Sequence, residues 1–561
     1  MAATIPTPVN EPYRRNGIPG ASGDDGVSSS SIADTASSSH FVMRNKPLHA
    51  NRHMRVITVG AGASGIYMAW KLKYSFTDFT LNVYEKNPEV SGTWYENRHN
   101  YTYSFQPKWD WSANYASSHE IYTYFNDFVD QYKLRPYISL NHEVVGASWE
   151  EHTSTWVVKI KNADGVFEQR CDFLINAAGI LNNWKWPAIP GLQSYKGTLL
   201  HSAAWDDSVD LTGKHVGLIG NGVAKHVTTF IREPTWVAPS LGMDYHEYSD
   251  EEKRRFKEDP GVLLAMRKQT ELGMAMVFPN FIRGSAAQLA TQKYMQSTME
   301  SKLQNPDLAQ TLIPPFPPGC RRLTPGVDYL ESLGKENVTT IYGEITKVTE
   351  TGCVTEKAGS VDVDVLICAT GFNTTFKPRA SECITFAQSD VRRFLGPNCP
   401  IGNGPIIFSV EIEGEYIAQF LNRWQKEDIA SFDPKLEAVN DFMQQKDAFM
   451  PSTVWDDNCL SWYKDPRTQK VTALWPGSTL HYMEVLASPR YEDFEVRYAS
   501  KNRFAYLGNG FSQTELNPHI DKTYYIRERP DDQPLCRNSQ STYNAKDLGD
   551  HLDNYLKGVF Q

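Results

Sequence analysis

Long apolar runs are missing from this chain. No stretch approaches the ~20 consecutive apolar residues of a membrane-spanning helix, and the N-terminus lacks the apolar segment of a signal peptide. The sequence therefore predicts no transmembrane segment and a cytoplasmic location. An excess of positive charge is also missing, because 56 Lys and Arg face 66 Asp and Glu, which gives a formal net charge of -10. That balance argues against nucleic acid as the main partner.

Closely spaced cysteines are missing as well. The chain has eight cysteines in 561 residues, and none lies near another in sequence. This spacing predicts neither a disulfide framework nor a zinc site, and it indicates a reducing compartment. It also argues against a flavoprotein reductase that uses two neighbouring cysteines at its flavin. The eight are Cys171, Cys320, Cys353, Cys368, Cys383, Cys399, Cys459 and Cys536.

The first 46 residues have few large apolar side chains. They are rich in Ser, Pro, Gly and Asp, which predicts a disordered N-terminal tail. The rest of the chain is long enough for two or three domains with sizeable cores.

A glycine-rich stretch follows the first apolar run. The run at 56–59 meets glycines at 60–65, which we call the first glycine turn, and a helix-like segment at 66–70 comes next. A second run at 81–84 ends in Glu85. Strand, glycines, helix, strand and acid in this order are typical of a dinucleotide-binding unit. The alternative is an ordinary tight turn between a strand and a helix.

Each part of this unit has a physical role. Gly60 permits the tight turn, Gly62 lets the backbone approach a pyrophosphate, and Gly65 lets helix and strand pack closely. The helix N-terminus offers free N–H groups and a positive dipole end to phosphates. Glu85 is expected to accept hydrogen bonds from ribose hydroxyls.

A second glycine turn lies farther along the chain. The apolar run 215–219 leads into Gly220, Asn221 and Gly222, so the chain has two nucleotide-binding turns, one suited to a flavin and one to a nicotinamide cofactor. Only residues 223–226 separate it from the next strand, 227–232. Parallel strands need a crossover of roughly ten or more residues. We therefore expect the two strands to form a hairpin, or one to leave the sheet, or the segment to be disordered. In each case the turn lacks a third glycine and the helix that would hold a pyrophosphate.

Other patterns complete the predicted fold. We expect an α/β protein with two Rossmann-like dinucleotide-binding domains and a helical insertion at about residues 235–317. Strands are predicted at 156–160, 173–179, 338–342 and 363–371, and helices at 120–133, 251–257 and 285–302.

A motif between the two turns carries a family resemblance. Its residues are Tyr195, Gly197, His201, Trp205 and Asp206. With these residues the sequence resembles the flavin-dependent Baeyer–Villiger monooxygenases, particularly their fungal members. The resemblance runs from Met54 to about Glu528, and includes 319–322, 369–371 and 507–511.

The resemblance implies an activity and a domain order. FAD and NADPH are the expected cofactors, and dioxygen and a small ketone the expected substrates. One oxygen atom enters the ketone to give an ester or lactone, within fungal secondary metabolism. The implied domains are the tail 1–46, the first part of the FAD-binding domain at 47–190, the NADP-binding domain at 191–369, and the second FAD-binding part with the substrate side at 370–561.

The resemblance also assigns residues. Arg322 is the expected catalytic cation, because arginine stays protonated and stabilises anionic oxygen; the alternative is a surface arginine beside Arg321. Arg232, followed by Glu233, matches the arginine that favours the NADPH 2′-phosphate, although a solvated arginine is the alternative. His201 is expected in a hinge or as a structural histidine. Flavin contacts are implied for Thr93, Trp94, Tyr95, Glu96 and Tyr101, and a nicotinamide-ribose contact for Trp462, with core packing as the alternative for these side chains.

Two departures from the family pattern leave alternatives open. The segment between Arg98 and Tyr101 is shorter than in the family, so the acid expected beside Arg322 has no counterpart, and Asp110 is out of frame. This gap and the one after Gly222 indicate either a gene model that omits short coding stretches or a natural variant that has lost NADPH binding. The rival functions are a nitrogen- or sulfur-oxidising flavin monooxygenase, which the motif argues against, and a flavin-binding protein without turnover.

Overall fold

The structure is a computed structural model. It describes residues 41–95, 102–181, 183–206, 208–220, 227–238, 245–326, 328–374, 394–519, 521–523 and 526. Contacts divide the chain into Met1–Val42 and Met43–Gln561, and the described helices and strands all belong to the second unit. Most of the predicted tail lies outside the described residues. Within the described part, no helix is long and apolar enough to cross a membrane.

The first sheet is parallel and follows from near-continuous apolar strands. Such strands are buried on both faces when helices or other layers cover them. The first glycine turn leads from the central strand into helix α1 (Ala63–Ser75), as the sequence predicts. The strand order is β3 (Ile138–Ser139), β2 (Phe79–Tyr84), β1 (Met54–Val59) and β7 (Phe173–Asn176).

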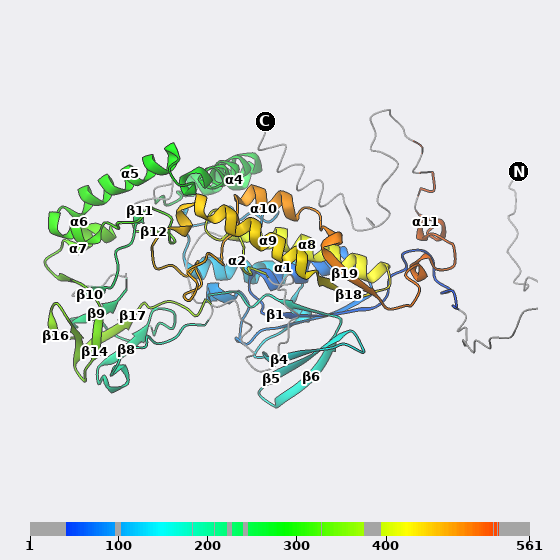
Figure 1. Cartoon of the computed structure of the whole chain (residues 1–561), viewed down its shortest axis with the longest axis horizontal. Helices are drawn as coiled ribbons and strands as arrows, with labels where there is room; N and C mark the ends of the chain where they lie inside the picture. The colour runs from blue at the N-terminus through cyan, green and yellow to red at the C-terminus, as the bar shows by residue number, and fades with distance from the viewer. Residues whose placement is uncertain are drawn as a thin grey trace, which may run out of the picture. The chain divides into compact units, whose positions relative to one another are not determined.

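Two layers cover this sheet. On one side, α8 (Ile406–Lys426) packs against α1 and shares its apolar core (Figure 1). The two helices cross closely at Gly414, where an added Cβ would lie 2.3 Å from the Tyr67 ring. On the other side, an antiparallel sheet packs its apolar residues against Ile57 and Leu174. Its strands are β4 (Glu143–Glu150), β5 (Thr155–Asn162) and β6 (Gly165–Cys171).

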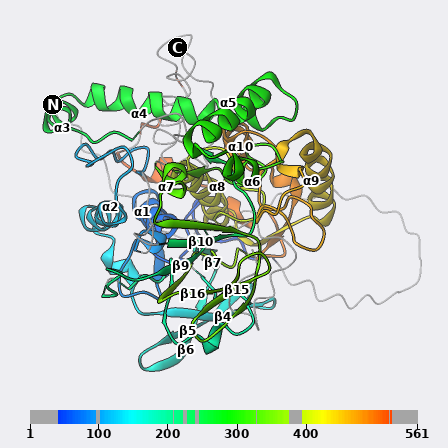
Figure 2. The same cartoon turned by 90° about the vertical axis from the view of Figure 1, so that its left-hand side faces the viewer.

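The second sheet corrects one prediction. Strands β9 and β10 are neighbours in it and run parallel, with Val216 opposite Val227 and Ile219 opposite Phe230 (Figure 2). The expectation that they form a hairpin, or that one leaves the sheet, is wrong. The third possibility concerns residues 221–226, which lie outside the described residues. The strand order is β13 (Val338–Tyr342), β10 (Val227–Ile231), β9 (Val216–Ile219), β17 (Val365–Cys368) and β8 (Thr198–His201).

The predicted helical insertion is confirmed. Side-chain caps start its helices: Ser249 accepts a hydrogen bond from the Glu252 N–H, and Ser285 from the Gln288 N–H. The insertion holds α3 (Asp250–Glu258), α4 (Pro260–Ala275), α5 (Ala286–Leu303) and α6 (Pro306–Leu312).

The remaining elements are short strands and helices around these units. The helices are α2 (Ser118–Gln131), α7 (Tyr329–Leu333), α9 (Leu436–Phe449), α10 (Thr479–Leu486) and α11 (Gln513–Leu516). The strands are β11 (Val237–Ala238) with β12 (Thr324–Pro325), β14 (Ile345–Val348) with β15 (Gly352–Thr355) and β16 (Gly359–Asp362), and β18 (Ile429–Pro434) with β19 (Phe494–Tyr498).

The described residues contain one disulfide, which the wide spacing of cysteines in the sequence did not predict. Cys320 and Cys459 are joined across 139 residues, a separation that gives no sequence signal. Four further cysteines are free and buried, at positions 171, 353, 368 and 399.

Candidate active site

The first glycine turn has the backbone that its sequence predicts. Gly60 has φ +99°, a conformation that L side chains rarely adopt. A Cβ on Gly65 would lie 1.9 Å from the Gly60 carbonyl oxygen, so helix and turn fit only with glycine there. Gly62 is the N-cap of α1 and no side chain caps this helix end. The first N–H groups of α1 are therefore left for an anion.

A second segment closes the cradle. The Ser91 N–H donates to the Ala61 carbonyl at 2.9 Å, and a Cβ on Gly92 would lie 2.9 Å from the Gly62 Cα. The Glu85 carboxylate accepts hydrogen bonds from the Ala61 N–H at 2.8 Å and the Asn87 N–H at 2.9 Å. Each carboxylate oxygen keeps a further lone pair and can accept one more hydrogen bond. The contact of Glu85 with a ribose stays a prediction. These residues fit the phosphate end of a dinucleotide such as FAD.

The predicted flavin-contact segment begins directly at this cradle. A short 3-10 helix spans Gly92–Tyr95, so Thr93, Trp94 and Tyr95 follow Gly92 in one turn, and Thr93 is half-buried. Glu96 and Tyr101 lie outside the described residues. The flavin contacts of these residues stay predictions.

Tyr195 and Gly197 of the motif form one packed unit. The Tyr195 hydroxyl donates to the Val363 carbonyl at 2.8 Å, and a Cβ on Gly197 would lie 2.4 Å from that hydroxyl oxygen. The Tyr195 ring thus packs directly over Gly197. Burial raises the pKa of Tyr195 to about 12. This aromatic residue and this glycine therefore anchor the chain as it enters β8.

The histidine of the motif is buried and partnered. The His201 ring stacks on Trp184 with centroids 4.6 Å apart, and its Nδ1 accepts a hydrogen bond from the Ala203 N–H at 3.1 Å. Burial lowers the pKa of His201, so the ring is neutral near pH 7. This is the environment of a structural histidine. Trp205 is exposed, and the Asp206 carboxylate accepts from the Ser208 N–H at 2.9 Å in a local turn.

The second glycine turn starts like the first. Gly220 has φ +114°, and its added Cβ would lie 2.7 Å from the Ala369 carbonyl oxygen. Gly222 lies outside the described residues. Only six residues, 221–226, connect Gly220 to β10. At 3.6 residues per turn, they can form fewer than about two turns of α-helix.

Three arginines lie where the second sheet meets the helical insertion. We call Arg232, Arg321 and Arg322 the arginine cluster. Arg232 directly follows β10, at the carboxyl edge where parallel sheets bind ligands. Arg321 contacts the Glu233 carboxylate at 3.4 Å and the Pro234 carbonyl oxygen. Burial lowers the pKa of Arg321, Glu233 opposes that shift, and the charge of Arg232 adds to it.

Among the described residues, two of these cations have no anionic partner. Arg232 and Arg322 are exposed, and neither makes an ion pair or hydrogen bond to another residue in the described part of the chain. Asp110, the acid nearest to the family position in sequence, pairs instead with Lys108 at 2.6 Å. The unpaired guanidinium groups are suited to bind an anionic ligand.

Arg322 lies close to the segment that carries Trp462. The side chain of Tyr463 is buried, which raises its pKa to about 12, and the positive charge of Arg322 opposes that rise. The half-buried Trp462 ring meets Tyr463 edge-on, with centroids 4.9 Å apart. The fold thus brings the predicted catalytic arginine and the predicted nicotinamide-side tryptophan to one place.

Sequence reasoning missed two residues that hold the segment 103–104, which follows the predicted flavin contact Tyr101. Arg267 on α4 donates to the Tyr103 carbonyl at 2.9 Å and the Ser104 carbonyl at 3.0 Å. Glu411 on α8 accepts from the Ser104 N–H at 2.6 Å, and its burial raises its pKa to about 7. Both residues lie in helices, where a charged side chain usually indicates a solvent-exposed position.

Known proteins identify the family. A family model described as an NAD(P)-binding Rossmann-like domain matches residues 58–132. The FAD-binding monooxygenase moxY of Dothistroma septosporum is 34% identical over 87% of this chain and 85% of its own. This chain belongs to the FAD-binding monooxygenases. A second member, stcW of Emericella nidulans, is 32% identical over 84% of this chain and 89% of its own.

Solved structures support the fold of this monooxygenase. The cyclohexanone monooxygenase from Rhodococcus sp. Phi1, crystallised with NADP+, matches with a TM-score of 0.68. The match covers 80% of this chain and 100% of that one, at 23% sequence identity. At that identity the likeness concerns the arrangement of the two dinucleotide-binding domains.

Proposed function

We propose that this monooxygenase uses FAD and NADPH to insert one oxygen atom from dioxygen into a ketone, giving an ester or lactone, and that it acts in fungal secondary metabolism. The observation that supports it most is the pair of sites in one chain. An uncapped helix N-terminus ends the first glycine turn, and the arginine cluster lies at the carboxyl edge of the second sheet. FAD, when bound, supplies the oxygen chemistry.

The protein's own groups would position the two cofactors and stabilise the charge that develops during the reaction. The turn at Gly60–Gly65 would hold the pyrophosphate of FAD, and Glu85 a ribose. Arg232 and Arg321 would bind the phosphate of NADPH. Arg322, a permanent cation without a partner among the described residues, would stabilise negative charge that develops on oxygen as the ketone reacts.

The test is turnover with a panel of ketones. Purified protein should oxidise NADPH in air faster with a ketone present, and mass spectrometry should detect the ester. An Arg322→Ala variant should keep its flavin absorbance and its flavin reduction by NADPH but lose ester formation by at least about 100-fold. The exposed Arg254 on α3, paired only with Glu251, gives the matched control: Arg254→Ala should behave as wild type. Ester at the wild-type rate from Arg322→Ala would refute the assignment.

One observation favours a second candidate, a flavin-binding protein with impaired use of NADPH. The connection after Gly220 is too short for the crossover helix that would carry the pyrophosphate. Photoreduction of the flavin, followed by air and ketone, separates the two cases. Ester from photoreduced protein but not from NADPH would establish the second candidate.

A further inference from the structure

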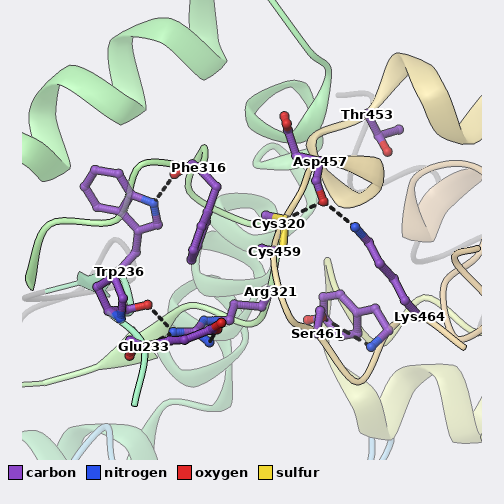
Figure 3. Close-up of a disulfide and its surroundings, with 12 residues drawn as sticks. Glu233, Trp236, Phe316, Cys320, Arg321, Thr453, Asp457, Cys459, Ser461 and Lys464 are labelled. Carbon is purple, nitrogen blue, oxygen red and sulfur yellow. Dashed lines mark hydrogen bonds and ion pairs between the residues drawn. A yellow bond between two sulfur atoms is a disulfide. The ribbon is translucent and has the colours of Figure 1, made fainter. Parts of the chain in front are cut away.

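The Cys320–Cys459 disulfide adjoins the arginine cluster, because Cys320 directly precedes Arg321 and Arg322 (Figure 3). We propose that this disulfide is a redox-sensitive clamp that positions Arg321 and Arg322, so that affinity for NADPH depends on whether the two sulfurs are bonded. The proposal rests on the proposed function, in which Arg321 binds the phosphate of NADPH and Arg322 supplies the catalytic charge. It makes the two cysteines positioning residues, not catalytic ones.

The segment that carries the arginines is anchored on two sides. On the side of the second sheet, the Trp236 indole donates to the Phe316 carbonyl at 2.7 Å, and Arg321 donates to the Pro234 carbonyl oxygen (Figure 3). Just after Arg322, β12 pairs with β11. These contacts are non-covalent and act within the part of the chain that carries Arg232.

On the opposite side, the disulfide is the covalent anchor. It joins Cys320 to the segment around Asp457, whose carbonyl accepts hydrogen bonds from the Cys459 N–H at 2.9 Å and from the Lys464 ammonium. The carboxylate of Asp457 pairs with Arg283 at 3.0 Å. That segment is therefore held by contacts other than the disulfide, and it leads directly to Trp462. Opening the S–S bond would free the arginine segment from a fixed support.

The structure accommodates both oxidation states. The Cys320 Sγ lies 3.3 Å from the Asp457 carbonyl oxygen, so a reduced Cys320 thiol has an acceptor already in place. Cys320 is fully buried and Cys459 is 6% exposed, so Cys459 is the more accessible of the two residues. A dithiol reductant attacks one of the two sulfurs, forms a mixed disulfide, and leaves as a cyclic disulfide while both cysteines become thiols. Hydrogen peroxide reverses the change, because two thiols and one peroxide give one disulfide and two waters.

The experiment measures NADP+ binding by calorimetry on the flavin-loaded protein, once oxidised with peroxide and once reduced with dithiothreitol. A non-reducing peptide map verifies the Cys320–Cys459 link in the oxidised sample. The oxidised protein should bind NADP+ about tenfold more tightly, within the usual range of coupling between sites. The flavin spectrum should not change, since the first glycine turn is not touched.

Variants separate positioning from general stability. Cys459→Ala should bind NADP+ like reduced wild type, with or without dithiothreitol. The matched control is Cys353→Ala, which removes a buried free cysteine on β15 and should keep the wild-type response. If Cys459→Ala does not fold, the comparison of oxidised and reduced wild type still decides.

Each outcome bears on one proposal. Equal NADP+ affinity in both states, a missing cross-link after oxidation, or no NADP+ binding at all overturns the clamp. Redox-dependent NADP+ binding without ester from any ketone supports the clamp and overturns the ketone chemistry.

Discussion

The two glycine turns begin alike and continue differently. Gly60 and Gly220 both end a parallel strand with positive φ, and each approaches a neighbouring backbone that excludes a Cβ. After the first turn comes α1, a helix of 13 residues with a bare N-cap. After the second come six residues and then β10. The two turns thus share the opening glycine but differ in the length of chain that follows it before the next strand.

This difference changes what holds each nucleotide. At the first turn, backbone N–H groups and a helix dipole face the ligand. At the second, charge comes from side chains, above all Arg232 at the sheet edge and Arg321 beside Glu233. We expect the first site to depend on backbone shape and the second on guanidinium charge.

Gly65→Val should have the largest effect and act on the first turn alone. Its Cβ would lie 1.9 Å from the Gly60 carbonyl oxygen, so α1 has to move away from the turn. We expect the purified protein to lose its flavin, measured as the ratio of absorbance at 450 nm to that at 280 nm (about the flavin and protein maxima).

Gly273→Ala is the control for that change. Gly273 lies in helix α4, and no atom lies within 4 Å of its added Cβ. Alanine favours the helix by about 1 kcal/mol, so flavin content should match wild type and stability should rise slightly. Full flavin content in Gly65→Val would show that the first turn is not the flavin site.

Gly220→Ala should act on the second site and spare the first. The Cβ would lie 2.7 Å from the Ala369 carbonyl oxygen, which disturbs the carboxyl edge where β9 meets β17. NADP+ affinity should fall about tenfold, equal to about 1.4 kcal/mol, while flavin content stays constant. Calorimetry measures the NADP+ affinity, and flavin absorbance measures the flavin content.

The control here is Gly213→Ala. Gly213 also has positive φ, +69°, but no atom lies within 4 Å of its added Cβ, so only the backbone penalty of about 1 to 2 kcal/mol applies. Its NADP+ affinity should equal that of wild type. Flavin loss in Gly220→Ala would mean that the two regions do not act separately.

The elements that could be predicted from the sequence are those that depend on residues close together in the chain. The first turn, α1, the helical insertion and the strands of both sheets other than β3 and β8 follow from apolar periodicity and glycine placement, and the structure confirms them. Helix α8 was not predicted, although it completes the core around β1, because its apolar face is interrupted by Glu411, Glu413 and Glu415.

Contacts between distant segments were not predictable from pattern. Nothing near Cys320 indicates Cys459, and nothing near Arg267 indicates the carbonyl of Ser104. The hairpin prediction failed for a related reason. It assumed a crossover of ordinary length, whereas the structure keeps β9 and β10 parallel across a short connection.

A smaller effect, on the free energy of unfolding, tests the first region through its dependence on pH. Glu411 holds Ser104, which lies close in sequence to the predicted flavin contact Tyr101, and burial raises the folded-state pKa of Glu411 from 4.5 to about 7. Below pH 4.5 both folded and unfolded states are protonated, and the full stabilisation is present. As the pH rises towards 7, the unfolded state releases the proton first, so the free energy of unfolding falls. The loss is complete above about pH 7 and amounts to at most about 3 kcal/mol.

Glu411→Gln should remove this pH dependence, because the amide oxygen can still accept from the Ser104 N–H and the amide nitrogen can donate to the Ser104 hydroxyl. We expect the free energy of unfolding in urea to fall less between pH 5 and pH 8 in Glu411→Gln than in wild type. Glu437→Gln, at an exposed position on α9, should follow wild type. Since every other titrating group is shared, their contributions cancel in the difference. An equal fall in Glu411→Gln and wild type would mean that Glu411 is already ionised in the folded protein, and that the segment 103–104 is held by charge and not by a neutral carboxyl.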